Sequence, residues 1–162
     1  MMKIGFIASV LAVTLITGAA GSAFAARPGP RMERRDAFRA VVEELTAINM
    51  ELAWVLQRPV SQRDLQEVIG LVNFLTEQVN QQESRVEFLL AQEPDPPDAE
   101  VTAALQNVLT VANAIAQEAW NELELNSSTW PAGLVDAVSN VEDASQNVVN
   151  VVQDVLGGGI PS

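Results

Sequence analysis

Three residue types that carry much of protein chemistry are missing from this sequence, which has no cysteine, no histidine and no tyrosine. Lysine occurs only at Lys3. The general base that titrates near neutral pH, the thiolate nucleophile and the phenol acid are therefore unavailable, and Schiff-base and P-loop chemistry need a lysine that the rest of the chain does not offer. Disulfides and lipid attachment to cysteine are excluded as well, so stability has to come from packing.

The same absences remove the common metal sites of helical proteins, because di-iron bundles need Glu-x-x-His pairs and c-type haem needs C-x-x-C-H. Glu83 with Glu87, and Glu118 with Glu122, lie four residues apart on single helix faces, where a hard cation would find two carboxylates. No loop of further ligands accompanies either pair. We interpret both as solvated acidic faces and expect no metal and no cofactor.

Catalysis by carboxylates alone, as in glycoside hydrolases, needs two acidic residues and a cleft that raises the pKa of one of them. The regular apolar spacing described below gives no sign of such a cleft. We therefore expect that the protein is not an enzyme.

Positive charge is scarce and lies at one end of the chain. The formal net charge is −12, five arginines fall between residues 27 and 39, and no basic residue follows Arg85. A basic N-terminal end on an acidic body is expected, and an acidic body argues against nucleic acid or anionic lipid as its partner.

Residues 1–25 have the pattern of a signal peptide. Lys3 precedes an apolar run, and Ala23-Phe24-Ala25 offers the small residues at which signal peptidase cuts. The run is short for a helix that spans a bilayer. We expect an exported protein, periplasmic or extracellular, whose mature chain does not insert stably into a membrane.

The rest of the chain carries four apolar stripes in which steps of three and four residues alternate, the spacing of one face of an α-helix. The stripes are Phe38, Val41, Leu45, Ile48, Leu52 and Val55; Leu65, Val68, Val72, Leu75, Val79, Val86 and Leu89; Val101, Leu105, Val108, Ala112, Ile115, Ala119 and Leu123; and Leu134, Ala137, Val141, Ala144, Val148, Val151 and Val155. Valine favours strands, but the spacing of the last stripe indicates a helix.

Proline-containing segments separate the stripes. Pro59 ends the first helix, and residues 61–64 have the pattern of a capping box that starts the second. In the segment 93–98 we expect Asp95 to cap the third helix and Pro96 to occupy its first position, with Asp98 in the first turn. A further turn at residues 126–131 precedes the fourth helix.

These boundaries predict an all-α fold, an up-down-up-down antiparallel four-helix bundle of coiled-coil type after the signal peptide. The predicted parts are the signal peptide 1–25, a flexible arm 26–30, the bundle 31–156 with helices 31–57, 62–92, 96–125 and 131–156, and a flexible tail 157–162. Trp54 and Trp120 are expected at the ends of the core, and Trp130 over the last turn.

The second stripe is interrupted, because its core-facing position between Val79 and Val86 is Gln82. Antiparallel pairing of the first two helices places this position opposite the arginine-rich start of the first. We predict a polar layer there, in which Gln82 and Glu83 meet arginines. The candidate partners are Arg34, Arg35 and Arg39.

Wide apolar stripes without catalytic residue types favour a non-enzymatic protein that acts through protein–protein interaction or self-assembly, with a protein partner or a homo-oligomer. A first alternative is a carrier that holds a small apolar ligand where Ala112, Ala119, Ala137 and Ala144 leave room. A second is a periplasmic stress chaperone or sensor, although the L-T-x-x-Q signature of small exported helical chaperones does not occur.

Overall fold

The structure is a computed structural model that describes residues 30–57, 64–94 and 96–157, with side chains from residue 34 onward. The expected signal peptide, nearly all of the expected arm and the tail after Gly157 lie outside the described residues.

Four helices account for almost all of the described chain, and no strand occurs among the residues that are described. They are α2 (Pro30–Leu56), α3 (Leu65–Ala91), α4 (Ala99–Asn126) and α5 (Ala132–Leu156). The all-helical fold predicted from the stripes is confirmed. The valine-rich segment 148–155 is helical as well, because its residues repeat with the helical spacing.

The start of α4 corrects one predicted boundary. Asp98, not Asp95, is the N-cap residue: its backbone is extended, and its side chain accepts a hydrogen bond of 2.9 Å from the backbone N–H of Val101. The physical reason is Pro97, since a residue that precedes a proline is forced out of the helical region, and Pro96 therefore cannot open the helix. α3 begins at Leu65, three residues later than expected, and Ser61 of the predicted capping box lies outside the described residues.

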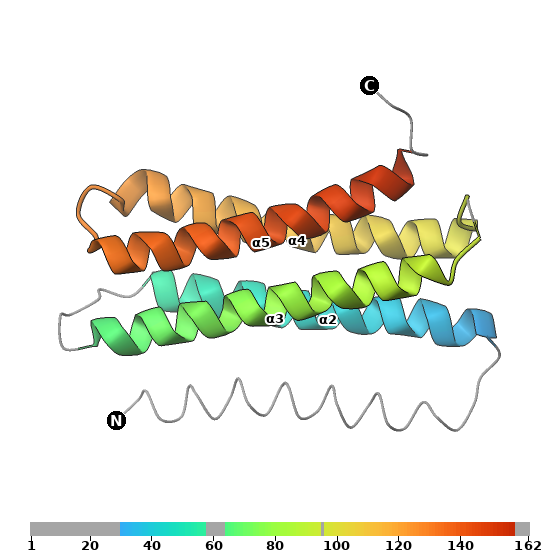
Figure 1. Cartoon of the computed structure of the whole chain (residues 1–162), viewed down its shortest axis with the longest axis horizontal. Helices are drawn as coiled ribbons and strands as arrows, with labels where there is room; N and C mark the ends of the chain where they lie inside the picture. Colours follow the sequence, from blue (N-terminus) through green and yellow to red (C-terminus); the bar gives the residue numbers. More distant parts are fainter. Residues whose placement is uncertain (1–29, 58–63, 95, 158–162) are drawn as a thin grey trace.

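The helices pack as two layers of two. In Figure 1, α3 and α5 lie in front and α2 and α4 lie behind, and α2 and α4 run in the direction opposite to α3 and α5. Each helix has two extensive neighbours: α2 packs on α3 and α4, and α5 packs on α3 and α4. The bundle therefore contains two antiparallel pairs and two parallel pairs.

The helices α3 and α4 follow one another in the chain but do not form one of these extensive contacts. They lie diagonally across the bundle, as Figure 1 shows. The helices α2 and α3 are neighbours, as expected, whereas α3 and α4 are not extensive neighbours although their connection is also short. Six extended residues reach about 20 Å, whereas the diagonal between helices spaced about 10 Å apart is about 14 Å, so the proline-rich segment is long enough to cross.

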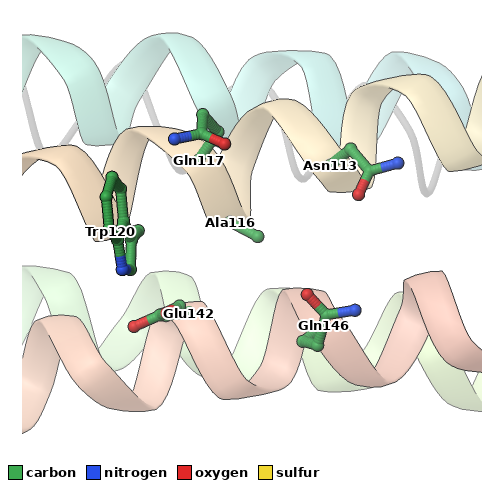
Figure 2. Close-up of a pocket in the computed structure, with 6 residues that line it drawn as sticks. All are labelled: Asn113, Ala116, Gln117, Trp120, Glu142 and Gln146. Carbon is green, nitrogen blue, oxygen red and sulfur yellow. The ribbon is translucent and has the colours of Figure 1, made fainter.

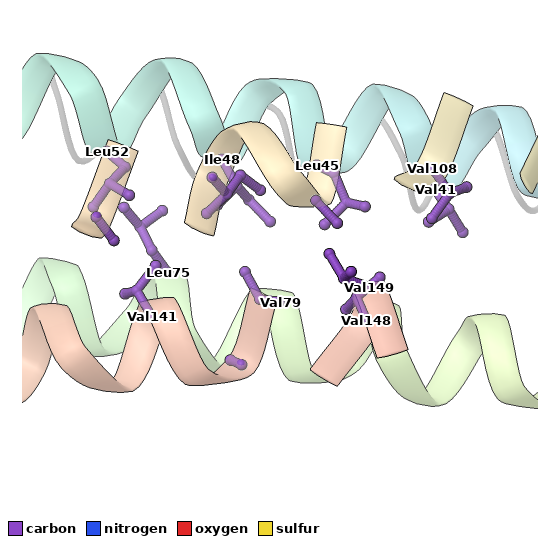
Figure 3. Packing of buried hydrophobic residues seen from close by; sticks show 14 of the residues in the cluster. Val41, Leu45, Ile48, Leu52, Leu75, Val79, Val108, Val141, Val148 and Val149 are labelled. Atoms are coloured by element: carbon purple, nitrogen blue, oxygen red, sulfur yellow. The ribbon is translucent and has the colours of Figure 1, made fainter. Parts of the chain in front are cut away.

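The apolar stripes meet in one continuous core. Side chains from α2, α3 and α5 point toward one another in Figure 3, where Leu45 and Ile48 face Val79 and Val148. The first stripe is buried along its whole length, as are most positions of the other three. Trp130 packs against the edge of this core beside the last turn, as expected. No helix in the described part of the chain is long and apolar enough to cross a membrane.

Candidate functional site

The arginines of the predicted polar layer lie at the start of α2, and the structure gives each of them an acidic partner. Arg34 Nε lies 3.3 Å from Glu93 Oε1, Arg35 Nη1 lies 3.9 Å from Glu100 Oε2, and Arg39 Nε lies 3.5 Å from Glu43 Oε1. The side chain of Glu93 is 3% exposed, so the contact with Arg34 is the most enclosed of the three. It joins the start of α2 to the segment that follows α3.

Gln82 enters the core as the interrupted stripe predicts. It is buried, and its Oε1 has no hydrogen-bond partner. Glu83 is half-buried; burial raises the pKa of its carboxyl, and the neighbouring Glu87 carboxylate raises it further. An arginine would lower that pKa. The pairing of Gln82 and Glu83 with arginines stays a prediction, and the direction of this pKa shift does not support it.

A pocket of about 310 Å³ lies elsewhere, between α4 and α5. Figure 2 shows that α4 supplies one wall and α5 the other. The lining residues are Asn113, Ala116, Gln117, Trp120, Glu142 and Gln146. On α4 they recur at steps of three and four, and on α5 Glu142 and Gln146 are four apart, so each wall is a stripe along one helix face beside the core.

The walls differ in chemical character along the pocket. The indole of Trp120 is 47% exposed and projects from α4 toward the helix that carries Glu142, as Figure 2 shows. Ala116 is buried between Asn113 and Trp120 along α4, and its small side chain leaves room for the pocket among the larger lining residues. An aromatic face, a carboxylate and three amide side chains therefore surround one opening.

Hydrogen bonds within each helix orient two of these amides. Gln117 Nε2 donates to Asn121 Oδ1 at 2.9 Å, and Gln146 Nε2 donates to Asn150 Oδ1 at 3.2 Å. Each bond uses one amide N–H and leaves the Oε1 oxygen of the same side chain as an acceptor. The arrangement can therefore accept hydrogen bonds from a ligand at the amide oxygens and at Glu142.

Burial raises the pKa of Glu142, and the adjacent Asp143 carboxylate raises it further. Glu122 on α4 behaves in the same way: burial and Glu118 raise the pKa of its carboxyl, while a hydrogen bond from Asn126 lowers it. Both carboxyls are thus partly withdrawn from water and near another acid, and of the two it is Glu142 that lines the pocket. A cation placed beside them would relieve both effects.

The expectation that Trp120 lies at the end of the core is wrong, and Trp54 is also 40% exposed. Trp120 directly follows the core residue Ala119. Consecutive residues of a helix point about 100° apart, so the side chain of Trp120 lies beside the buried face and not on it. The signal that sequence reasoning missed is the polar spacing of Asn113, Gln117 and Trp120, which repeats like a stripe beside the apolar one. Nothing in a single sequence says that α5 would face it.

No group of three or more acidic side chains that could hold a metal ion occurs in the described ranges. The alanines considered for an apolar ligand, Ala112, Ala119, Ala137 and Ala144, belong to the packed core. The pocket lies beside them on the outer side of α4 and α5 and is framed by polar groups. Among the described residues we take this pocket as the candidate site.

Comparison with models of protein families, with curated proteins and with solved structures finds no match for this chain.

Proposed function

We propose that the protein is exported and non-enzymatic, and that it acts by binding a protein partner through the face formed by α4 and α5. The observation that carries this proposal is the pocket between Trp120 and Glu142. A half-exposed tryptophan, aligned amides and a carboxylate on two neighbouring helices are residue types that protein interfaces use as anchors and as orienting polar groups.

The residue inventory supports a binding role over a catalytic one. Without histidine, cysteine or tyrosine, the pocket contains one carboxylate as its sole titratable side chain. Acid–base catalysis between two groups of different pKa would require a second such group in the same opening. The amides of the lining bind and orient, but they do not transfer protons near neutral pH.

Export rests on residues 1–25, whose pattern is that of a cleaved signal peptide. The intact mass of the protein purified from its native host should correspond to a chain that begins at Ala26. A mass that includes the first 25 residues, with the protein recovered inside the cell, would contradict export.

The interaction is tested by site-specific photo-crosslinking in the native host. A photoreactive residue at Gln117, in the pocket, should give a discrete adduct with another protein or with a second copy of this chain. The matched control is Gln81, which is exposed on α3. Adducts of equal yield from both positions, or none from Gln117, would remove the proposed interface.

A further inference from the structure

The pocket lies in the half of the chain that has no positive charge. From Ala99 to the end, the sequence contains eight acidic residues and no lysine or arginine. Arg35 of α2 lies beside Glu100 at the start of α4, about 30 Å along the helix from Trp120. Electrostatic attraction at the pocket therefore selects for a positively charged ligand and against an anionic one.

The hydrogen-bonding groups agree with that charge. Gln117 and Gln146 each use one N–H in a bond to the asparagine four residues on, while their Oε1 oxygens remain acceptors, and the carboxylate of Glu142 accepts only. A guanidinium or ammonium group consists of donors alone, so it can bond to these amide oxygens and to the carboxylate, whereas an anion could use only the remaining amide N–H groups.

The indole of Trp120 on α4 is the third feature that favours a cation. Trp120 presents an exposed indole across the opening from the helix of Glu142, as Figure 2 shows. A cation over an indole face is attracted by the negative potential of the ring, and arginine also stacks on it through its plane. Tryptophan on one side and a carboxylate on the other thus frame a position for one cationic side chain.

We propose that this pocket binds an arginine or lysine side chain presented by a basic segment of the protein partner. The inference rests on the proposed function, because it names the chemistry that the α4–α5 face recognises. The pocket is of the smallest size class that holds ligands, and it is shallow enough to take a side chain offered from outside. Amides along both walls then orient the backbone of the segment that carries it.

Calorimetric titration of the full protein tests the proposal. The ligands are a short peptide with two arginines among glycines and serines, and the same peptide with both arginines replaced by citrulline, which keeps the shape and removes the charge. The arginine peptide should bind about five- to thirtyfold more tightly, which corresponds to about 1–2 kcal/mol from the indole and the carboxylate together. Equal binding of the two peptides would overturn the proposal.

Two variants and two matched controls locate the effect. Glu142→Gln and Trp120→Leu should each weaken the arginine peptide about fivefold or more. Asp143→Asn removes the same charge from the exposed neighbour of Glu142, and Trp54→Leu removes an exposed indole from α2; each control should change the affinity less than about twofold. A loss for Asp143→Asn equal to that for Glu142→Gln would show diffuse attraction to an acidic surface and contradict a site.

The two proposals fail in different ways. If crosslinking at Gln117 captures a partner but arginine and citrulline peptides bind alike, the proposed interface is supported and the proposal that the pocket binds a cationic side chain is wrong. If the arginine peptide binds in the pocket but no protein crosslinks there in the host, cation binding by the pocket is supported and the proposed protein–protein interaction is wrong. Circular dichroism of each variant establishes that the helices persist, so that a loss of binding reports on the pocket.

Discussion

Gln82 places an amide in the seam of α3 where every neighbouring position of the stripe is aliphatic. It is 6% exposed, and its Oε1 accepts no hydrogen bond. A buried acceptor without a donor has lost its hydrogen bonds to water and forms none in the protein, which costs free energy of folding. The residue therefore lowers the stability of the bundle, unless its role lies in fixing the register of the helices.

Gln82→Leu should raise the free energy of unfolding by about 1 kcal/mol or more, because it removes the unsatisfied acceptor and adds apolar area to the core. Gln81→Leu, on the exposed side of the same turn, should change it by less than about 0.5 kcal/mol. Chemical denaturation measures both. A destabilised Gln82→Leu variant would mean that the amide makes a favourable interaction in the native state.

Asp98 supplies the side-chain cap at the start of α4, since its carboxylate accepts the N–H of Val101. Asp98→Ala should cost about 1 kcal/mol of stability, whereas Asp98→Asn keeps an acceptor and should cost only a few tenths. Thermal unfolding of the two variants compares them. Equal losses would assign the effect to the negative charge at the helix N-terminus and not to the cap.

At the scale of elements, the apolar spacing predicts the four helices because a stripe needs only local information. The predicted ends agree with the structure within about three residues, and the starts of α3 and α4 are the least accurate. The error at α4 comes from Pro97, which makes Asp98 the cap instead of Asp95. The neighbours of each helix could not be predicted in the same way. All four stripes are similar in width and residue type, so nothing in them specifies that α4 packs on α2 and not on α3.

The candidate site could not be predicted from the sequence for the same reason. Its two walls come from α4 and α5, and each wall taken alone is an ordinary polar face. Gln82, by contrast, was predictable as core-facing, because one polar residue within an apolar stripe is a local signal. The acidic partners of Arg34 and Arg35 were not predictable, since they depend on where the proline-rich segment returns, whereas Glu43 lies four residues after Arg39 on the same helix and is a local signal.

The diagonal arrangement of α3 and α4 predicts two distances. The chain has no cysteine, so cysteines introduced for spin labels will be the only ones. Labels at Thr46 and Ala114, exposed on the neighbouring helices α2 and α4, should lie closer together by about 4 Å or more than labels at Gln81 and Ala114 on the diagonal helices. Pulsed electron paramagnetic resonance measures both pairs. The reverse order would mean that α3 and α4 are neighbours.

At the scale of the whole molecule, negative charge works against the folded state near neutral pH. The net charge is −12, and burial is the first cause that raises the pKa of Glu51, Glu83, Glu122 and Glu142 above the usual 4.5. A carboxyl whose pKa is higher in the folded state binds its proton more tightly there than in the unfolded chain. Its contribution to stability is therefore present below the unfolded pKa and is lost as the pH rises through the folded pKa.

The melting temperature should accordingly rise when the pH is lowered from neutral toward 4.5, the usual pKa of these carboxyls, and added salt at neutral pH should raise it too. Glu51→Gln should flatten part of the pH dependence, because Glu51 Oε2 is buried without a partner. The exposed Glu77→Gln should leave the slope nearly unchanged. A melting temperature that falls steadily as the pH is lowered over this range would show that ion pairs, such as that of Arg34 with Glu93, dominate the pH dependence of stability.

The proposed function depends on binding at the α4–α5 face, and its most direct measurement is the side-chain NMR spectrum of ¹⁵N-labelled protein with and without the partner captured at Gln117. The indole N–H of Trp120 and the side-chain amides of Asn113, Gln117 and Gln146 should shift on binding, while the indole of Trp54 keeps its position. Shifts confined to Trp54 and to amides of α2 and α3, with Trp120 unchanged, would contradict it.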